Sequence, residues 1–325
     1  MAGDRCFLFT ERLPTRHADV AGRSLRLAFI WGMTDVLDSV AVTLGSASEL
    51  TLGSASKLRR GETRTLVDAG RLRILLTESS ELIDAVQRLR YEVFAAEPGF
   101  SDQIGDHATR RDADHVDEFA EHLVAVDDEY GVLGCARLLA PPRAIAAGGW
   151  YSASEFDLGE LDAIGDSLVE MGRACVAPGH RHGAITALLW AALLRYVDDA
   201  DYRYVMGCVS VPLSGPAGAW RGSTLRGVRD HVLARHRAPW RAVPLCETLV
   251  DGSALEEIAP PSTLALPPLL RAYLRLGATV CGEPAIDESF DVGDFVTILD
   301  RDHANVRYLD RLRATGARLA VSTRE

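Results

Sequence analysis

The amino-acid sequence predicts an α/β protein. The clearest indication is a buried strand at Leu168 to Val176, a tight loop at Pro178 to Gly183 and an apolar helix at Ala184 to Val197. A second buried strand is expected at Tyr202 to Ser210, and a further strand followed by a helix begins near Leu72. With 325 residues, 47% of them hydrophobic, the chain is long enough to bury one large core.

Composition limits the function classes. The net charge is −11, so nonspecific binding to nucleic acid is not expected. The six cysteines are scattered and form no C-x-x-C pair, which argues against a zinc site and fits a reducing cytoplasm. No apolar run approaches the ~20 residues that a membrane-spanning helix needs, and the N-terminus lacks signal-peptide features. We expect a cytoplasmic protein without a bound metal, in peripheral contact with the inner membrane face at most.

The N-terminal segment differs from the rest of the chain. Residues 43–50 (TLGSASEL) and 51–58 (TLGSASKL) form a tandem octamer that differs at one position. Such a repeat has too little apolar surface to offset the entropy lost on ordering. We therefore expect residues 1–70 to be a disordered, low-complexity extension, with a partner-binding arm as the alternative. Residues 71–325 are expected to form the folded domain.

The first half of that domain carries charged residues at defined places. A helix with apolar residues at helical spacing follows the strand at 71–77, and Arg90 lies on it. The polar loop at 101–121 holds Asp114 and Asp117, whose carboxylates suit a cationic amine as well as they suit solvent. A hairpin at 122–139 then places Arg137 in mid-strand, where a buried guanidinium needs an acid or a substrate carboxylate.

The central strand carries Glu170 and Arg173 in an otherwise apolar run. Burial raises a carboxyl pKa and a nearby arginine lowers it, so this pair is a candidate for proton transfer, with a structural ion pair as the alternative. After the strand, Gly179 to Gly183 lie at a helix N-terminus, where backbone N–H groups and the helix dipole bind phosphate.

The C-terminal part adds a basic segment and closing elements. Residues 221–241 contain six arginines, which form either a solvated helix face or a docking surface for an acidic partner. A helix at Leu266 to Leu276 ends at Gly277, and strands are expected at 279–287 and 290–299.

Several of these stretches resemble the GNAT acyltransferases. The turn at 181–184 (RHGA) is similar to their pyrophosphate-binding turn. The pattern E-x-x-R-x-x-V-x-P-x-x-R from Glu170 is more specific, as are R-Y-x-V-F from Arg90, G-x-x-R-L-L from Gly134 and G-x-P-A-x-D from Gly282. Together they resemble the branch of acyl-carrier-protein-dependent ornithine N-acyltransferases and, more distantly, the acyl-homoserine lactone synthases.

The resemblance implies a central, mixed, twisted sheet flanked by helices, with two parallel strands splayed to admit a pantetheine arm. It implies transfer of a fatty acyl group from acyl carrier protein, or from acyl-CoA, to the amine of an amino acid such as ornithine in lipid biosynthesis. The acyl-phosphopantetheine donor is then a co-substrate, and no cofactor is held permanently. The residues implied are Glu170 and Arg173 for catalysis; Val176, Arg181, His182, Gly183 and Ala184 for the donor; and Arg90, Phe94, Asp114, Asp117, Arg137 and Ser210 for the acceptor.

Other functions remain open at this point. One alternative is an acetyl-CoA-dependent N-acetyltransferase for a small polar amine. A second is a signal synthase of the homoserine-lactone type, which carries a tryptophan in its first loop; residues 100–115 contain none. A third is a catalytically silent lipid- or partner-binding protein, against which the retained acids and arginines argue. For the carrier-protein reading, Arg181 with the basic segment is the expected docking surface, and anionic lipid headgroups are the alternative partner.

Overall fold

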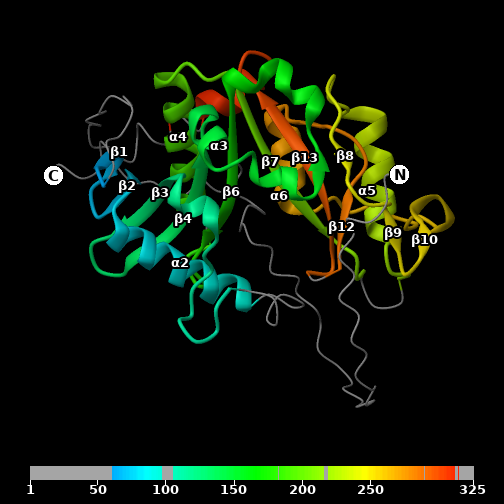
Figure 1. The fold of residues 1–325 in the computed structure, drawn as a ribbon, viewed down its shortest axis with the longest axis horizontal. Helices are drawn as coiled ribbons and strands as arrows, with labels where there is room; N and C mark the ends of the chain where they lie inside the picture. The colour runs from blue at the N-terminus through cyan, green and yellow to red at the C-terminus, as the bar shows by residue number, and fades with distance from the viewer. Residues whose placement is uncertain are drawn as a thin grey trace.

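The computed structural model describes residues 61–96, 105–181, 183–215, 219–288, 290–311 and 314. Its centre is a nine-stranded mixed sheet in the order β1-β2-β3-β4-β6-β7-β13-β11, with β12 also paired to β13 (Figure 1). The strands are β1 (Thr63–Ala69), β2 (Leu72–Thr77), β3 (Glu121–Asp127), β4 (Gly131–Leu139), β6 (Leu168–Val176), β7 (Tyr204–Pro212), β11 (Thr279–Val280), β12 (Ala285–Asp287) and β13 (Val292–Asp300).

Helices cover both faces of this sheet. They are α2 (Ser80–Ala95), α3 (Pro141–Ala146), α4 (Ala184–Asp199), α5 (Ser223–Arg235) and α6 (Pro268–Leu276). Short 3-10 helices are η1 (His115–Glu118), η2 (Tyr151–Ser154), η3 (Gly159–Ser167) and η4 (Leu255–Glu257). Two small ladders pair β5 (Phe156–Asp157) with β8 (Val243–Pro244) and β9 (Leu249–Val250) with β10 (Ser253–Ala254). The predicted α/β sheet flanked by helices is confirmed.

The alternation of side chains along each strand decides which helix lies on which face. On β3, Leu123 and Ala125 belong to the large core cluster that contains α4, whereas Val124 packs with α2. The same large cluster contains buried residues of α5 and α6. The sheet therefore separates an α2 side, which also carries η2, from an α4, α5 and α6 side.

The parallel strands β6 and β7 pair over a short stretch only. The pairs run from Leu168–Tyr204 to Glu170–Met206; beyond them β6 stays paired with β4, and β7 with β13. The two strands therefore splay after Glu170, as the resemblance implied. A Cβ atom on Gly207 would lie 2.5 Å from the Met171 carbonyl oxygen, so the vertex of the splay requires glycine.

A β-bulge interrupts β6 just past this vertex. Cys135 opposes Cys175 and Arg137 opposes Gly172, so two residues of β6 face one residue of β4. Arg173 takes a φ of 50°, in the left-handed region that non-glycine residues rarely adopt. The bulge redirects the Arg173 side chain relative to a regular strand.

The start of the folded domain was predicted too late. Residues 63–69 were assigned to the extension, but they form β1, which pairs with β2 along its length. Leu66 and Val67 of β1 are buried in the large core cluster. The octamer repeat at 43–58 lies outside the described residues.

Candidate active site

A buried network of arginines and aspartates ties α2, η1 and β4 together. Arg90 has no exposed surface; its guanidinium pairs with Asp117 at 2.6 Å and with Asp112 at 2.9 Å. Arg137 pairs with Asp114 at 2.6 Å and with Asp117 at 3.0 Å. Burial disfavours the Asp117 carboxylate, but Arg90 and Arg137 outweigh it and lower its pKa. Because each charge here already has a partner, the network is an architectural support for the site.

This arrangement bears on four residues that were predicted to contact the acceptor. Asp114 and Asp117 form a capping box at η1, and their carboxylates are already paired with arginines. Arg90 and Arg137 are 0% and 3% exposed, so both guanidinium groups are closed off from a substrate. The expectation that Arg137 pairs with an acid of the preceding loop is confirmed. Phe94, 6% exposed, packs with the apolar residues of α2.

Arg173 is the arginine that reaches the surface of the network. Its side chain is 27% exposed, and its contacts with Asp112 and Asp114 are long, at 3.3 and 3.6 Å. The Tyr151 ring lies 4.9 Å from the Arg173 guanidinium and 4.9 Å from that of Arg137. Arg173 therefore combines a fixed position with donor capacity for a further anion.

Glu170 does not pair with Arg173, so the alternative of a structural ion pair between these two residues is wrong. Its carboxylate accepts hydrogen bonds from the Tyr151 and Ser152 backbone N–H groups, at 2.6 and 2.8 Å, and from the Ser152 hydroxyl at 2.5 Å. Burial raises the pKa of Glu170 despite these bonds. The bulge explains the outcome, since it turns Arg173 toward the aspartates. Glu170 holds η2 against the vertex of the splay.

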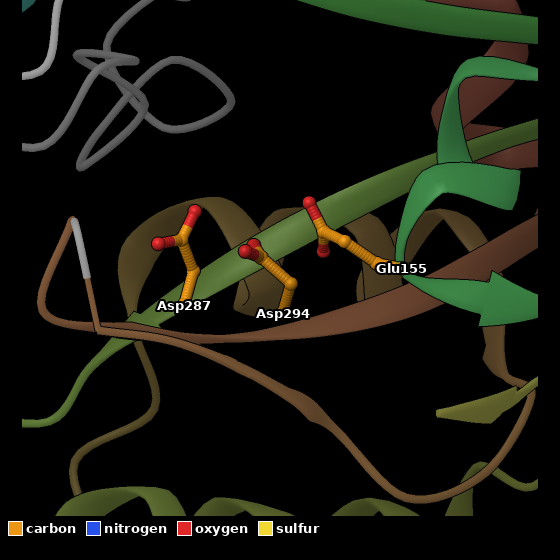
Figure 2. A group of neighbouring side chains, drawn as sticks. All are labelled: Glu155, Asp287 and Asp294. Atoms are coloured by element: carbon orange, nitrogen blue, oxygen red, sulfur yellow. The ribbon is translucent and has the colours of Figure 1, made fainter. Parts of the chain in front are cut away.

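Three carboxylates gather on the same face of the sheet, next to η2. One carboxylate oxygen each of Glu155, Asp287 and Asp294 lies within 4.8 Å of the others (Figure 2). We call Glu155, Asp287 and Asp294 the carboxylate cluster. The Ser210 hydroxyl donates to Asp294 at 2.6 Å, which ties this predicted site residue to the cluster.

The cluster has unusual electrostatics. Burial, and then the charges of Asp294 and Asp287, raise the pKa of Glu155 to about 7. Burial likewise raises the pKa of Asp294 to about 6, although the Ser210 hydrogen bond opposes this. The charge of Arg173 acts against both pKa shifts, so the guanidinium lies within electrostatic range of the cluster. We call Arg173 and the carboxylate cluster the bipolar site, because it combines a partly exposed arginine with a group of acids.

Sequence reasoning did not assign the cluster. Asp287 was noted only as the last residue of the G-x-P-A-x-D pattern, and Glu155 and Asp294 were not predicted as site residues. Glu155 comes from the segment after η2, whereas Asp287 and Asp294 come from β12 and β13. The β12–β13 hairpin brings Asp287 and Asp294 together, whereas Glu155 reaches them from a distant part of the chain that no local spacing connects to them.

The expected donor loop lies at the far end of the splay. Gly183 precedes α4 with a φ of 95°, and Ala184 opens the helix. The Arg181 guanidinium donates to the Val176 carbonyl at 3.2 Å, which fixes the loop against the end of β6. His182 lies outside the described residues. The helix N-terminus is thus presented beside the gap between β6 and β7, as phosphate binding would require.

In the folded structure, several arginines of the basic segment at 221–241 are paired with acids. Arg226 of α5 pairs with Asp230 at 2.7 Å, and Arg229 pairs with Glu283 at 2.7 Å and also with Glu256. Arg221 pairs with Asp251 and Asp291. These acids neutralise much of the surface that was expected to dock a carrier protein.

Comparisons with known proteins agree with this architecture. A model of the acetyltransferase (GNAT) domain matches residues 89–191. The L-ornithine N(alpha)-acyltransferase of Rhodobacter capsulatus is 36% identical over 234 residues, 70% of this chain and 89% of that protein. The enzyme of the same name from Rhizobium meliloti is 33% identical over 256 residues, 75% of this chain and 85% of that protein.

A solved structure of the CoA-dependent acyl-homoserine lactone synthase BjaI, with SAM and isopentyl-CoA, is 16% identical with a TM-score of 0.44. The match covers 75% of this chain and 84% of that one. The splayed sheet and the domain match define a GNAT acyltransferase. Within that superfamily, the chain belongs to the L-ornithine N(alpha)-acyltransferase family. None of the helices in the described part of the chain is long and apolar enough to cross a membrane.

Proposed function

We propose that this enzyme transfers a fatty acyl group from a phosphopantetheine thioester to the α-amine of ornithine, as a step in lipid biosynthesis. The observation that carries the proposal is its identity of 31–36% to four relatives of that name, over 70–77% of the chain. The bipolar site gives this substrate class a physical basis.

Ornithine carries one carboxylate and two ammonium groups, so it needs an anion-binding and a cation-binding end. Arg173 supplies the first, because its guanidinium is partly exposed and its aspartate contacts are long. The carboxylate cluster supplies the second and receives the side-chain ammonium. The α-amine then lies between them, near η2 and the vertex of the splay.

The chemistry asks for a neutral amine. Glu155, with a pKa of about 7, is well matched to accept the α-ammonium proton near neutral pH. The amine then attacks the thioester carbonyl, and the pantetheine thiol leaves with a proton. Glu170 acts as a positioning residue, because its oxygens hold the Tyr151 and Ser152 backbone in place. The turn at Gly179 to Gly183 receives the donor phosphate through backbone N–H groups, beside the Arg181 charge.

The donor on this proposal is acyl carrier protein. Acids pair with Arg226 and Arg229 of α5. The surface available to dock a carrier protein is therefore smaller than the sequence implies, and it centres on Arg181. Contact with anionic lipid at the inner membrane face stays a separate prediction, testable by sedimentation with anionic vesicles.

The test measures N-acylation by mass spectrometry with matched donors: one long acyl chain on carrier protein and on CoA, and acetyl-CoA. Four acceptors are compared: ornithine, lysine, putrescine without the carboxylate, and norvaline without the side-chain amine. We expect ornithine and the carrier-bound chain to be preferred. Equal kcat/KM for putrescine and ornithine would contradict the role of Arg173. Preference for acetyl-CoA would make the enzyme an acetyltransferase instead.

A matched pair of variants separates the two ends of the site. Arg173→Lys should raise KM for ornithine far more than for putrescine. Asp287→Asn should raise KM for ornithine far more than for norvaline. If both variants change all acceptors alike, the bipolar reading is wrong even when ornithine is acylated.

A further inference from the structure

A small apolar cavity lies behind the vertex of the splay. Its volume is about 20 Å³. It is lined by Met171, Trp190, Val205, Met206, Gly207, Tyr273, Leu276, Ala278, Thr297 and Leu299. The Thr297 hydroxyl donates to the Gly207 carbonyl at 2.9 Å, so this polar group of the lining is already satisfied.

The cavity begins where β6 and β7 part. The last paired residues are Glu170 and Met206, and the next residue on each strand, Met171 and Gly207, lines the cavity. A thioester whose pantetheine arm lies between the strands would bring its acyl group to this point. From there the chain has to continue toward one face of the sheet or the other.

The two faces differ in chemistry. On the α2 side, the Ser152 hydroxyl contacts Glu170 and lies 3.3 Å from Cys208, and the carboxylate cluster follows. On the other side, Trp190 of α4 and Tyr273 of α6 meet edge to face, with ring centroids 5.3 Å apart. Burying a methylene among the charged groups gains nothing, whereas burial against apolar surface is favourable.

We propose that this cavity is the entrance of the acyl-chain site, and that the chain runs between α4 and α6 on the face opposite the acceptor. The proposal rests on the proposed function for its donor. The Trp190–Tyr273 pair forms the floor and sets the preferred chain length. The acyl chain and the amino acid therefore reach the reacting carbonyl from opposite faces of the sheet.

The cavity must widen to take a chain. A volume of about 20 Å³ has room for about one water molecule. Met171, whose side chain packs on the α4 and α6 side, is unbranched and changes rotamer readily, so it is the residue expected to move first.

The first experiment locates the chain directly. A long acyl group with a terminal diazirine is presented on acyl carrier protein and on CoA, photolysed with the full-length enzyme, and mapped by peptide mass spectrometry. We expect labels on α4 and α6, at or near Trp190, Tyr273 and Leu276, that an unlabelled long-chain donor competes away. Labels confined to residues 141–167 or α2, or labels that are not competed away, would overturn the proposal.

Labelling needs no turnover, so it is separable from the proposed function. If α4 and α6 are labelled but no tested amine is acylated, the acyl-chain site is supported and the proposed acceptor is wrong. If ornithine is acylated but the label lies on the other face of the sheet, the proposed function is supported and the acyl-chain site is wrong.

The second experiment changes the size of the cavity. Leu276→Ala enlarges the cavity and should favour longer chains, by about fourfold in relative kcat/KM for each extra methylene buried. Ala278→Leu fills it and should favour shorter chains. Leu225→Ala is the matched control, because Leu225 is a fully buried leucine of α5, outside the lining and outside α4 and α6. An unchanged chain-length profile in both cavity variants, or the same shift in the control, would refute the assignment.

Discussion

Glu155→Gln should make the enzyme more stable and much less active, and the stability gain should depend on pH. Glu155 has an ordinary pKa of 4.5 and a pKa of about 7 in the folded protein. A carboxyl whose pKa rises on folding favours the folded state while it is protonated, and this advantage is lost as pH rises through the folded value. Above pH 7, therefore, the native protein holds an unfavourable charge.

The magnitude follows from the size of the shift. One pKa unit corresponds to 1.36 kcal/mol, so ionised Glu155 lowers the free energy of unfolding by about 3 kcal/mol at most. Solvent screening reduces this effect. Glutamine removes this charge at every pH. The free energy of unfolding should then rise by on the order of 1–3 kcal/mol at pH 8.5, with little change at pH 5.

The assay is urea unfolding of wild type and variant at both pH values, beside kcat/KM for ornithine. Activity should fall by about 10²–10⁴, the usual contribution of a general base. Glu247→Gln is the control, since Glu247 is an exposed carboxylate outside the cluster. An equal stability change at pH 5 and pH 8.5, or a loss at pH 8.5, would show that Glu155 carries no raised pKa.

Three further outcomes are expected. Asp294→Asn removes a like charge beside Glu155, so the acid limb of the kcat/KM profile should move to lower pH by about one unit; an unmoved limb would separate Glu155 from proton removal. Gly183→Val should weaken donor binding at least tenfold with KM for ornithine unchanged, because a side chain with φ near 95° disrupts the loop; unaltered donor affinity would displace the phosphate site. Deleting residues 1–60 should leave folding and activity intact, whereas deletion through Ala69 should lower thermal stability, because it removes buried Leu66 and Val67; equal stability of the two truncations would contradict the place of β1 in the core.

Local patterns predicted the elements well where each buries one face. The strand at 168–176 is β6 as predicted, and Gly277 ends α6 with a φ of 99°. The edge strand β1 was missed because its sequence, TRTLVDA, mixes polar and apolar residues, and only pairing with β2 shows it to be a strand.

The candidate site was only partly predictable, because its contacts join distant parts of the chain. The motif residues Arg90, Asp117 and Arg137 do meet, but in a closed network rather than around a substrate. The separation of Glu170 from Arg173 depends on a bulge that adds one residue to β6. The local sequence does not reveal such a shift in strand register. Glu155 and Asp294 come from distant parts of the chain and meet only in the folded structure.

The brevity of the β6–β7 pairing also divides the molecule for folding. From β1 to β6, neighbouring strands follow one another in the chain, so most of their contacts are local and form quickly. The strand β7 pairs with β13 from Tyr204–Asp300 to Pro212–Val292, which requires about ninety intervening residues to be in place. The N-terminal half can therefore assemble during synthesis, whereas β7 cannot complete its pairing until β13 has been made. In the folded protein, we expect the short β6–β7 pairing at Leu168 to Glu170 to mark a change in hydrogen-exchange protection between the two halves of the sheet.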